Sequence, residues 1–196
     1  MRWLNRKTGD EERALHLDAG VRLMSDGQFA EAINEFKQAL KIGPASCDLY
    51  SQLGSAFIAL QRWKEAIKAC NQAIKIDPFI AQPYRQLGLI YDQAGDFVEA
   101  LKVYVTAVTL EPKDYELRND LGIAYFNMGS YNEATKAFRQ SLLMNHATNP
   151  RAHYYLGLVY IDLKDRLAAK SACDSLNEMG RADLADDLRQ KLEAEL

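Results

Sequence analysis

The sequence predicts an all-α protein built from a repeated pair of short helices. Glycine, alanine and proline each recur at one fixed interval along the chain. The recurring residues are Gly20, Gly54, Gly88 and Gly122; Ala32, Ala66, Ala100 and Ala134; and Pro44, Pro78 and Pro112. A composition rich in alanine, leucine, glutamate, lysine and glutamine agrees with an all-helical chain. One short helix pair cannot bury its apolar face alone, so a fixed period indicates units that stack on their neighbours.

The copy at residues 81–114 shows the pattern most clearly. Its first apolar face ends at Gly95, because glycine adopts the left-handed conformation that closes a helix at no steric cost. Asp96 precedes the second helix, and Glu99 follows three residues later, which predicts a capping box. The second helix ends before Pro112, since proline cannot continue it. The unit is therefore a helix, a turn, a helix and a stop.

A helical hairpin that recurs at this interval resembles the tetratricopeptide repeat family, in which one repeat is about 34 residues long. The matched positions in this copy are Tyr84, Leu87, Gly88, Tyr91, Gly95, Ala100, Tyr104, Ala107 and Pro112. The resemblance covers Arg13 to about Gly180 and implies a right-handed α-solenoid of five hairpins followed by a C-terminal capping helix. The implied segments are an N-terminal extension at 1–12, repeats at 13–46, 47–80, 81–114, 115–149 and 150–180, and a capping helix at 181–196.

Several positions depart from the repeat. The fifth copy is offset by one residue, so Gly157 lies one position later than the period from Gly122 would place it, and His146 stands where proline is expected. Gln61 and Lys164 replace the turn glycine. Glutamine is strained at positive φ, so we expect the turn at Gln61 to have a different shape.

Two further helix starts can be predicted in the second half of the chain. Ser130 and Glu133 form a second capping-box pattern. Asn149 followed by Pro150 should begin the fifth repeat, because asparagine caps helices well and proline suits the first helical position.

The two terminal segments lie outside the repeats. Residues 1–12 are charged and are expected to fray, although Trp3 and Leu4 could pack on the first repeat or touch a partner. The last helix has one narrow apolar stripe, which suits a cap on the array. That stripe is made of Leu184, Leu188 and Leu192.

Charge and cysteine content limit the classes of partner and compartment. The net charge is −3 and the pI about 5.7, without the basic stripe typical of nucleic-acid binding. Cys70 and Cys173 share a position with Phe36, Tyr104 and Phe138, so they should be buried as small apolar residues rather than paired in a disulfide framework. No apolar run marks a signal peptide or membrane span. We expect a cytoplasmic protein.

No pattern of residues indicates catalysis. The three histidines, His16, His146 and His153, have no partner at metal-ligand or catalytic spacing, and no glycine-rich phosphate loop occurs. His16 stands where later copies carry aromatic residues, which predicts a packed or half-exposed side chain. We therefore expect no catalytic residue, no metal site and no cofactor.

The resemblance implies that the first helices of successive repeats line a concave, partner-binding groove. The residues expected there are Val21, Ser55, Arg85, Leu89, Asp92, Asn119, Ile123, Phe126, Asn127, Tyr154, Leu158 and Ile161. An apolar column, interrupted by Ser55, is formed by Val21, Leu89, Ile123 and Leu158. An exposed apolar strip with a polar rim usually marks an interaction site. The alternative is that some of these side chains pack neighbouring helices. Asn119 and Asn127 could hydrogen-bond a peptide backbone or be solvated.

The function predicted from these residues is that of a non-enzymatic scaffold or adaptor that binds a peptide or helix of another protein. Some chaperone adaptors of the family hold a C-terminal carboxylate with basic residues, but here the matching positions include Gln52, Gln82 and Gln86, so that function is not expected. The alternatives are a self-assembling, homo-oligomeric repeat module and, third, an enzyme or an enzyme's regulatory domain. Nucleic acid is not an expected partner.

Overall fold

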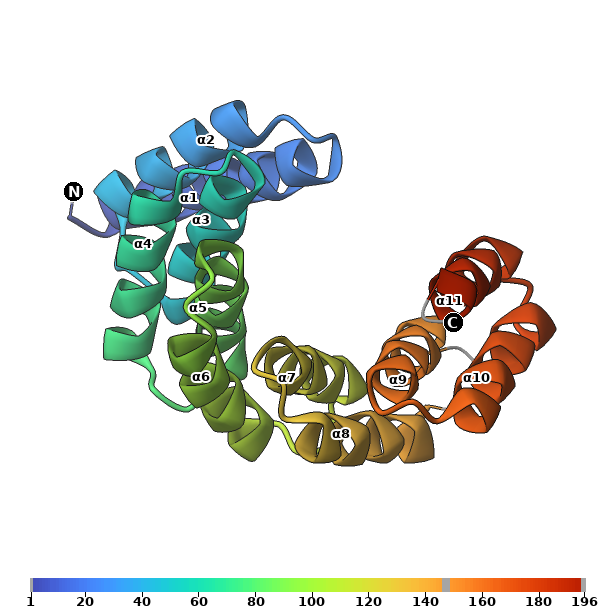
Figure 1. Ribbon diagram of the computed structural model, residues 1–196. Coiled ribbons are helices and arrows are strands. Elements are labelled where there is room, and N and C mark those ends of the chain that lie inside the picture. Colours follow the sequence, from blue (N-terminus) through green and yellow to red (C-terminus); the bar gives the residue numbers. More distant parts are fainter. Residues whose placement is uncertain (1, 146–148, 195–196) are drawn as a thin grey trace. The chain divides into compact units, whose positions relative to one another are not determined.

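The computed structural model describes the backbone of residues 2–145 and 149–194, and side chains from residue 9 onward within those ranges. This part of the chain contains eleven α-helices and no strand, as the sequence predicts. The helices are α1 (Arg2–Ser25), α2 (Phe29–Ile42), α3 (Cys47–Ala59), α4 (Trp63–Ile76), α5 (Ala81–Ala94), α6 (Phe97–Leu110), α7 (Tyr115–Asn127), α8 (Tyr131–Met144), α9 (Pro150–Asp162), α10 (Arg166–Glu178) and α11 (Ala182–Ala194). Figure 1 shows them in chain order.

The chain divides into two compact units, one up to Ala94 and one from Gly95. In the first unit, α1 packs on α2, α3 packs on α4, and α3 also contacts α5. In the second unit, α7 pairs with α8 and α9 with α10, while α7 also contacts α9. Within each unit, the paired first helices therefore pack both on their own second helix and on the first helix of the adjoining repeat.

Glycine allows the closest of these helix contacts. A Cβ atom added at Gly20 would lie 2.4 Å from the ring of Phe36, and one added at Gly122 would lie 2.6 Å from the ring of Phe138. Both rings are fully buried. Glycine at these two positions thus leaves the room that a large second-helix ring needs above the first helix.

The turn inside each hairpin keeps one shape even where glycine is missing. Gln61 and Lys164 have φ values of 56° and 59°, close to the 74° of Gly27 and the 71° of Gly129. The predicted change of shape at Gln61 is therefore wrong. The amide of the following residue, Arg62, still donates to the carbonyl five residues earlier at 2.8 Å, the bond that closes a helix in this way. That bond and the fixed repeat length hold a conformation that costs a non-glycine residue roughly 1–2 kcal/mol.

The two predicted capping boxes do not form. Asp96 and Ser130 begin their helices with ψ near 61° and 65°, and neither side chain caps an amide. Other helix starts do carry side-chain caps: Ser46 accepts from Leu49, Asp165 accepts from Ala168 at 3.1 Å, and Asn149 accepts from Ala152 at 3.2 Å. The predicted start of the fifth repeat at Asn149 and Pro150 is confirmed.

The ends of the described chain are helical. Helix α1 begins at Arg2, so the expectation that residues 1–12 fray is wrong for the backbone from Arg2 onward, where no proline interrupts the helix. The side chains of Trp3 and Leu4, and all of His146, lie outside the described residues. At the other end, α11 packs on α9 and α10, with Leu188 fully buried.

Candidate functional site

The first-helix face of the first unit carries two exposed apolar side chains. Val21 on α1 is 48% exposed and Leu89 on α5 is 36% exposed. Arg85 and Asp92, also on α5, are half-buried and take part in interactions within the chain. These residues combine apolar area with charge of both signs, as an interaction surface with a polar rim would.

Ser55 is half-buried and belongs to a polar node of the first unit, which is centred on the buried side chain of Gln86. The side-chain amide of Gln86 donates to the Ser55 hydroxyl and to the carbonyl of Ser51, both at 2.7 Å. The other end of Gln86 accepts from the thiol of Cys70 at 3.2 Å, and Gln86 is only 2% exposed. The node fills the space above Gly54, where an added Cβ would lie 2.8 Å from the Gln86 oxygen.

Sequence reasoning missed this role for Gln86. The signal was present, because Gln52, Gln86 and Asp120 occupy equivalent positions of successive repeats and are polar beside the apolar column of the first helix. A recurrent polar residue beside an apolar face indicates a buried group whose partners must be supplied by neighbouring helices.

Burial raises the pKa of the Cys70 thiol to about 12. The thiol therefore stays protonated and serves as a hydrogen-bond donor rather than as a nucleophile. Cys173 is likewise buried, and all three cysteines are unpaired, as expected.

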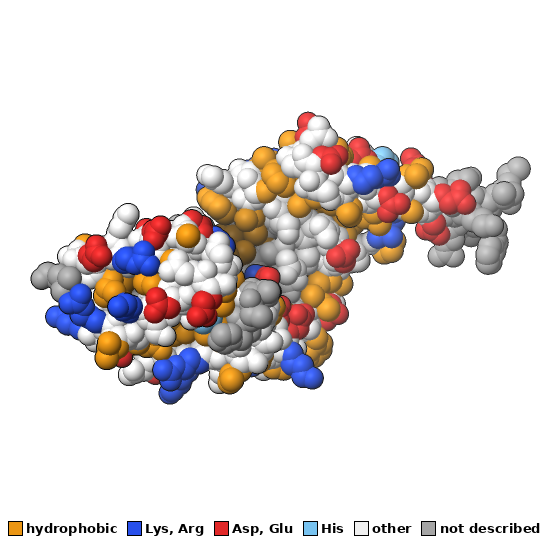
Figure 2. All heavy atoms as spheres, turned by 90° about the vertical axis from the view of Figure 1, so that its right-hand side faces the viewer, with side chains coloured by type: hydrophobic (Ala, Val, Ile, Leu, Met, Phe, Trp, Pro, Cys, Tyr) orange, Lys and Arg blue, Asp and Glu red, His pale blue; other side chains and the backbone are white. Residues whose placement is uncertain are grey.

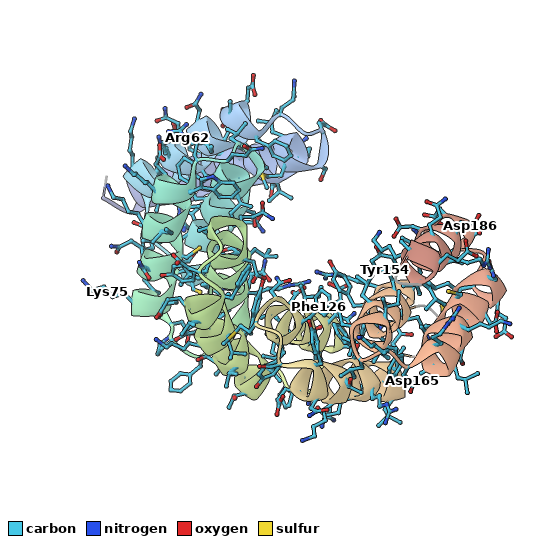
Figure 3. All side chains as sticks on the ribbon, in the orientation of Figure 1. Arg62, Lys75, Phe126, Tyr154, Asp165 and Asp186 are labelled. Atoms are coloured by element: carbon cyan, nitrogen blue, oxygen red, sulfur yellow. The ribbon has the colours of Figure 1, made fainter. Side chains whose placement is uncertain are left out.

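An aromatic cluster dominates the first-helix face of the second unit. The ring of Phe126 on α7 lies 5.9 Å from that of Tyr131 and 6.0 Å, nearly edge-on, from that of Tyr155. Phe126 and Leu158 on α9 are half-buried. Figure 3 marks Phe126 on α7. Its aromatic neighbours pack on it, and it keeps part of its surface exposed.

Two apolar residues of the predicted groove are almost fully buried. Ile123 and Ile161 are each 7% exposed and belong to the hydrophobic core of the second unit. Ile123 packs in the same cluster as Phe138, and Ile161 in the same cluster as Leu188. They support the face from behind rather than presenting area to a ligand.

Tyr154 links α9 to the last helix. Its hydroxyl donates to Asp187 at 2.6 Å, and Lys191 donates to the same carboxylate at 2.6 Å. Burial and the nearby Asp187 carboxylate raise the pKa of Tyr154, while the hydrogen bonds from Lys191 and Tyr154 lower the pKa of Asp187. The hydroxyl of Tyr154 is thus already hydrogen-bonded to a residue of α11.

The two asparagines of the predicted groove lie in different environments. Asn127 is exposed at the end of α7. Asn119 is 1% exposed, and its amide donates to Asn149 at 2.9 Å. Asn149 in turn donates to the hydroxyl of Ser141, which donates to the carbonyl of Tyr115, both at 2.8 Å. This chain of bonds ties α7, α8 and the start of α9 together and makes Asn119 a structural residue.

A second polar contact in this unit also lay beyond the sequence analysis. Arg151 on α9 donates to Asp120 on α7 at 2.7 Å, and Asp120 is 1% exposed. A carboxylate so buried needs a charged partner, because removing that partner would leave an uncompensated charge. Asp120 occupies the position of Gln86 one repeat later. The same position therefore holds an amide with hydrogen bonds in one repeat and a carboxylate in an ion pair in the next.

The structure forms no metal-ligand cluster where it describes side chains. No group of three or more histidine, cysteine, aspartate or glutamate residues there could hold a metal ion. His16 is half-buried and its Nδ1 lies 2.6 Å from the Glu35 carboxylate. Among the described helices, none has both the length and the apolar character needed to cross a membrane.

Three solved structures with a similar fold place this architecture among known proteins. PilF of Pseudomonas aeruginosa has a TM-score of 0.79 and 20% identity, over 96% of this chain and 90% of its own. MamA of Desulfovibrio magneticus RS-1 has a TM-score of 0.74 and 18% identity, over 90% and 97%. The protein TTC0263 of Thermus thermophilus has a TM-score of 0.71 and 21% identity, over 93% and 98%. At such identities the likeness shows the fold alone.

Comparison at the level of sequence identifies the family. None of the curated proteins matches the chain. The family model described as tetratricopeptide repeat matches residues 23–87 and 93–145, which is more than half of the chain. Together with the repeated hairpins, this match shows that the chain belongs to the tetratricopeptide repeat family.

Proposed function

We propose that this protein is a non-enzymatic scaffold that binds an extended segment or short helix of a partner protein on its first-helix faces. Proteins of this family generally act as scaffolds for protein–protein interaction. The mixed apolar and polar composition of the faces supports the proposal, since interfaces combine aromatic or aliphatic anchors with a polar rim.

Phe126 is the observation that carries the proposal. Its ring is oriented by Tyr131 and Tyr155, so little side-chain entropy is lost when a ligand covers it. Aromatic side chains that are held in place and partly exposed commonly dominate binding energy. Leu158 and Asn127 provide apolar area and an amide on the same face of the second unit.

The first unit would contribute a separate contact surface. Val21 and Leu89 are its exposed apolar residues, and Arg85 and Asp92 are its charged ones. Burial assigns Ile123, Ile161 and Asn119 to support of the face rather than to contact with the ligand.

Phe126→Ala should weaken capture of partner proteins from an extract of the native host at least about tenfold, since truncating a hot-spot residue costs about 2 kcal/mol. The matched control is Leu143→Ala, which removes an 88% exposed leucine from the second helix α8. Quantitative mass spectrometry of the captured proteins, with circular dichroism of both variants, measures the difference. Equal capture by the folded Phe126→Ala variant and the parent would contradict the proposal.

A second copy of the chain is the competing partner, and its contact would lie on the second helices α8 and α10 rather than on the first-helix faces. Leu143 and Leu167 are 88% and 84% exposed, and such side chains favour association between copies. Light scattering at micromolar concentration separates the two functions, because a monomer whose mass stays constant with concentration argues against self-assembly.

A further inference from the structure

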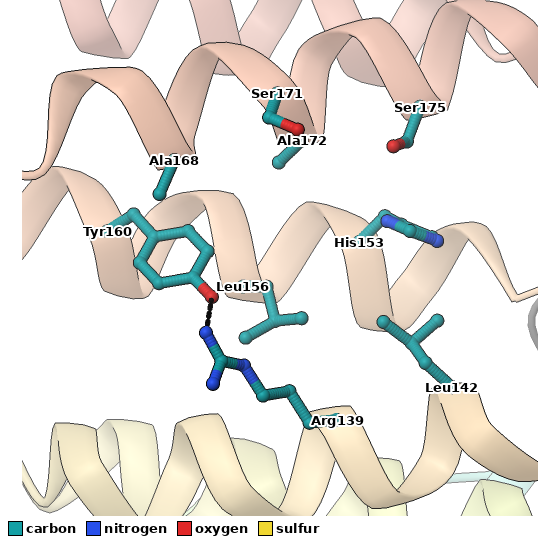
Figure 4. Close-up of a pocket in the computed structure, with 9 residues that line it drawn as sticks. All are labelled: Arg139, Leu142, His153, Leu156, Tyr160, Ala168, Ser171, Ala172 and Ser175. Carbon is teal, nitrogen blue, oxygen red and sulfur yellow. Dashed lines mark hydrogen bonds between the residues drawn. The ribbon is translucent and has the colours of Figure 1, made fainter.

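A pocket of about 310 Å³ lies among α8, α9 and α10. Its lining is Arg139 and Leu142 of α8; His153, Leu156 and Tyr160 of α9; and Ala168, Ser171, Ala172 and Ser175 of α10. Figure 4 shows Arg139 and Tyr160 near one end, His153 at the other and Leu156 between them. None of the residues proposed above to contact a partner on the first-helix face lines this pocket, so it is a separate surface of the second unit.

The lining favours an anionic group. It contains the guanidinium of Arg139 and the imidazole of His153, and none of its nine described residues carries a carboxylate. Arg139 donates to the hydroxyl of Tyr160 at 3.1 Å, which leaves the tyrosine hydrogen available for a ligand. Ser171 and Ser175 add two hydroxyl groups from α10. Donors of this kind around an apolar floor match a carboxylate on a short aliphatic stem.

The pocket lies where the second helix of the fifth repeat departs from those of the earlier four. Ala168, Ser171 and Ser175 occupy second-helix positions that carry larger side chains in every earlier repeat. Those earlier residues are Glu31, Glu65, Glu99 and Glu133 at the first position; Asn34, Lys68, Lys102 and Lys136 at the second; and Gln38, Gln72, Thr106 and Gln140 at the third. The α10 side of the pocket is therefore lined by smaller side chains than the earlier repeats carry at the same positions.

The first repeat shows which group fits such a position. His16 and His153 occupy equivalent positions of the first and fifth repeats, and so do Glu35 and Ala172. In the first repeat the carboxylate of Glu35 lies 2.6 Å from the ring nitrogen of His16. In the fifth repeat the same position of the second helix carries only the methyl group of Ala172. The pocket thus has room where the first repeat holds a carboxylate of its own.

We propose that this pocket binds the side chain of a glutamate in a partner peptide. Its carboxylate would accept from Arg139 and from the pocket hydroxyls, while its methylene groups pack on Leu142 and Leu156. Figure 2, which shows one face of the molecule, has acidic and basic side chains interspersed over it, so recognition depends on this local cluster rather than on a large field.

The probe is the tripeptide N-acetyl-Leu-Glu-Leu-amide, and its twin has glutamine in place of glutamate. The glutamate peptide should move the amide NMR signals of α10 around Ser171 and Ser175. It should also bind at least about tenfold more tightly than its twin, because the amide oxygen of glutamine still accepts but lacks the charge that strengthens the bond to Arg139. Equal binding of the two peptides, or shifts that map to another part of the chain, would overturn the proposal.

Matched variants sharpen the test. Arg139→Gln should weaken the glutamate peptide about tenfold, whereas Lys136→Gln, which removes an exposed charge from the same helix, should leave binding unchanged. Ala172→Glu supplies the carboxylate from within, as Glu35 does in the first repeat, and should abolish binding. Phe126→Ala should have no effect, so failure here is distinct from failure of the first-helix proposal. Undiminished binding by the folded Arg139→Gln variant would exclude the pocket.

Discussion

Two repeats of this chain fill the space above the first-helix glycine with different kinds of side chain. In the second unit, the space above Gly122 is taken by the fully buried ring of Phe138, which stacks on Tyr155 at 5.9 Å. In the first unit, the same position of the second helix holds only Cys70, and the space above Gly54 is completed by Gln86 from the next repeat. One solution is aromatic, and the other is polar.

The difference shows what each solution specifies. An aromatic stack tolerates small displacements, because dispersion and hydrophobic burial have little directionality. Gln86 makes three hydrogen bonds with both ends of its amide, to Ser51, Ser55 and Cys70, which fixes its position. The polar node therefore sets the position of α5 on α3, whereas the aromatic stack contributes mainly buried area.

The largest expected effect is on the aromatic side. Gly122→Val places new carbon atoms where Cβ alone would lie 2.6 Å from Phe138, and overpacking of this kind should lower the free energy of unfolding by about 3 kcal/mol. Urea denaturation measures the loss. Adding Phe138→Leu should recover part of it, because a smaller side chain leaves room. A second variant as unstable as the first would show that the ring is not the obstacle. Gly88→Val is expected to behave similarly.

An intermediate effect is expected at the polar node. Gln86→Leu leaves the buried Cys70 thiol without its acceptor and the Ser51 carbonyl without that donor, which should cost about 1–3 kcal/mol. Gln82→Leu, at an exposed position of the same helix, is the control and should change the free energy of unfolding by less than about 0.5 kcal/mol. If the two variants melt alike, the hydrogen bonds of Gln86 do not distinguish the polar repeat from the aromatic one.

The smallest effect concerns alkaline pH. Because the folded Cys70 thiol has its pKa raised from 9.0 to about 12, the unfolded chain loses this proton first, and stability should fall as pH rises from about 9 toward 12. Cys70→Ser keeps a donor for Gln86 and does not titrate in this range, so its stability should fall less steeply between pH 8 and pH 11. Parallel curves for parent and variant would contradict the raised pKa.

The sequence predicts the fold well because the recurring residues have structural roles that depend on their own position in the hairpin. Gly27, Gly95 and Gly129 mark turns, and the alanines that recur with the repeat are buried where second helices pack. The features that were predicted wrongly are local conformations that depend on the surrounding residues. Gln61 adopts the glycine conformation because the backbone bonds around it impose it, and Asp96 begins α6 without a side-chain cap.

The candidate site was less predictable, because position on a first helix does not determine exposure. The period distinguishes the first-helix face from the second, yet Ile123 is buried while Leu89, in the same column, is 36% exposed. Tyr154 was assigned to the groove, but its hydroxyl is bound by Asp187 from α11, a helix outside the repeat. Such contacts join positions with no common period, so repeat columns could not reveal them.

The hydrogen bonds of Asn149 bear on how the length of a repeat can change during evolution. Its side chain caps α9, accepts from Asn119 and donates to Ser141, so the beginning of the fifth hairpin is anchored to the fourth by hydrogen bonds. Helix α9 is then positioned by these hydrogen bonds rather than by the number of residues that precede it. The interval from Gly122 to Gly157 is one residue longer than the intervals before it, and the anchor allows such a change of length without a loss of alignment between hairpins.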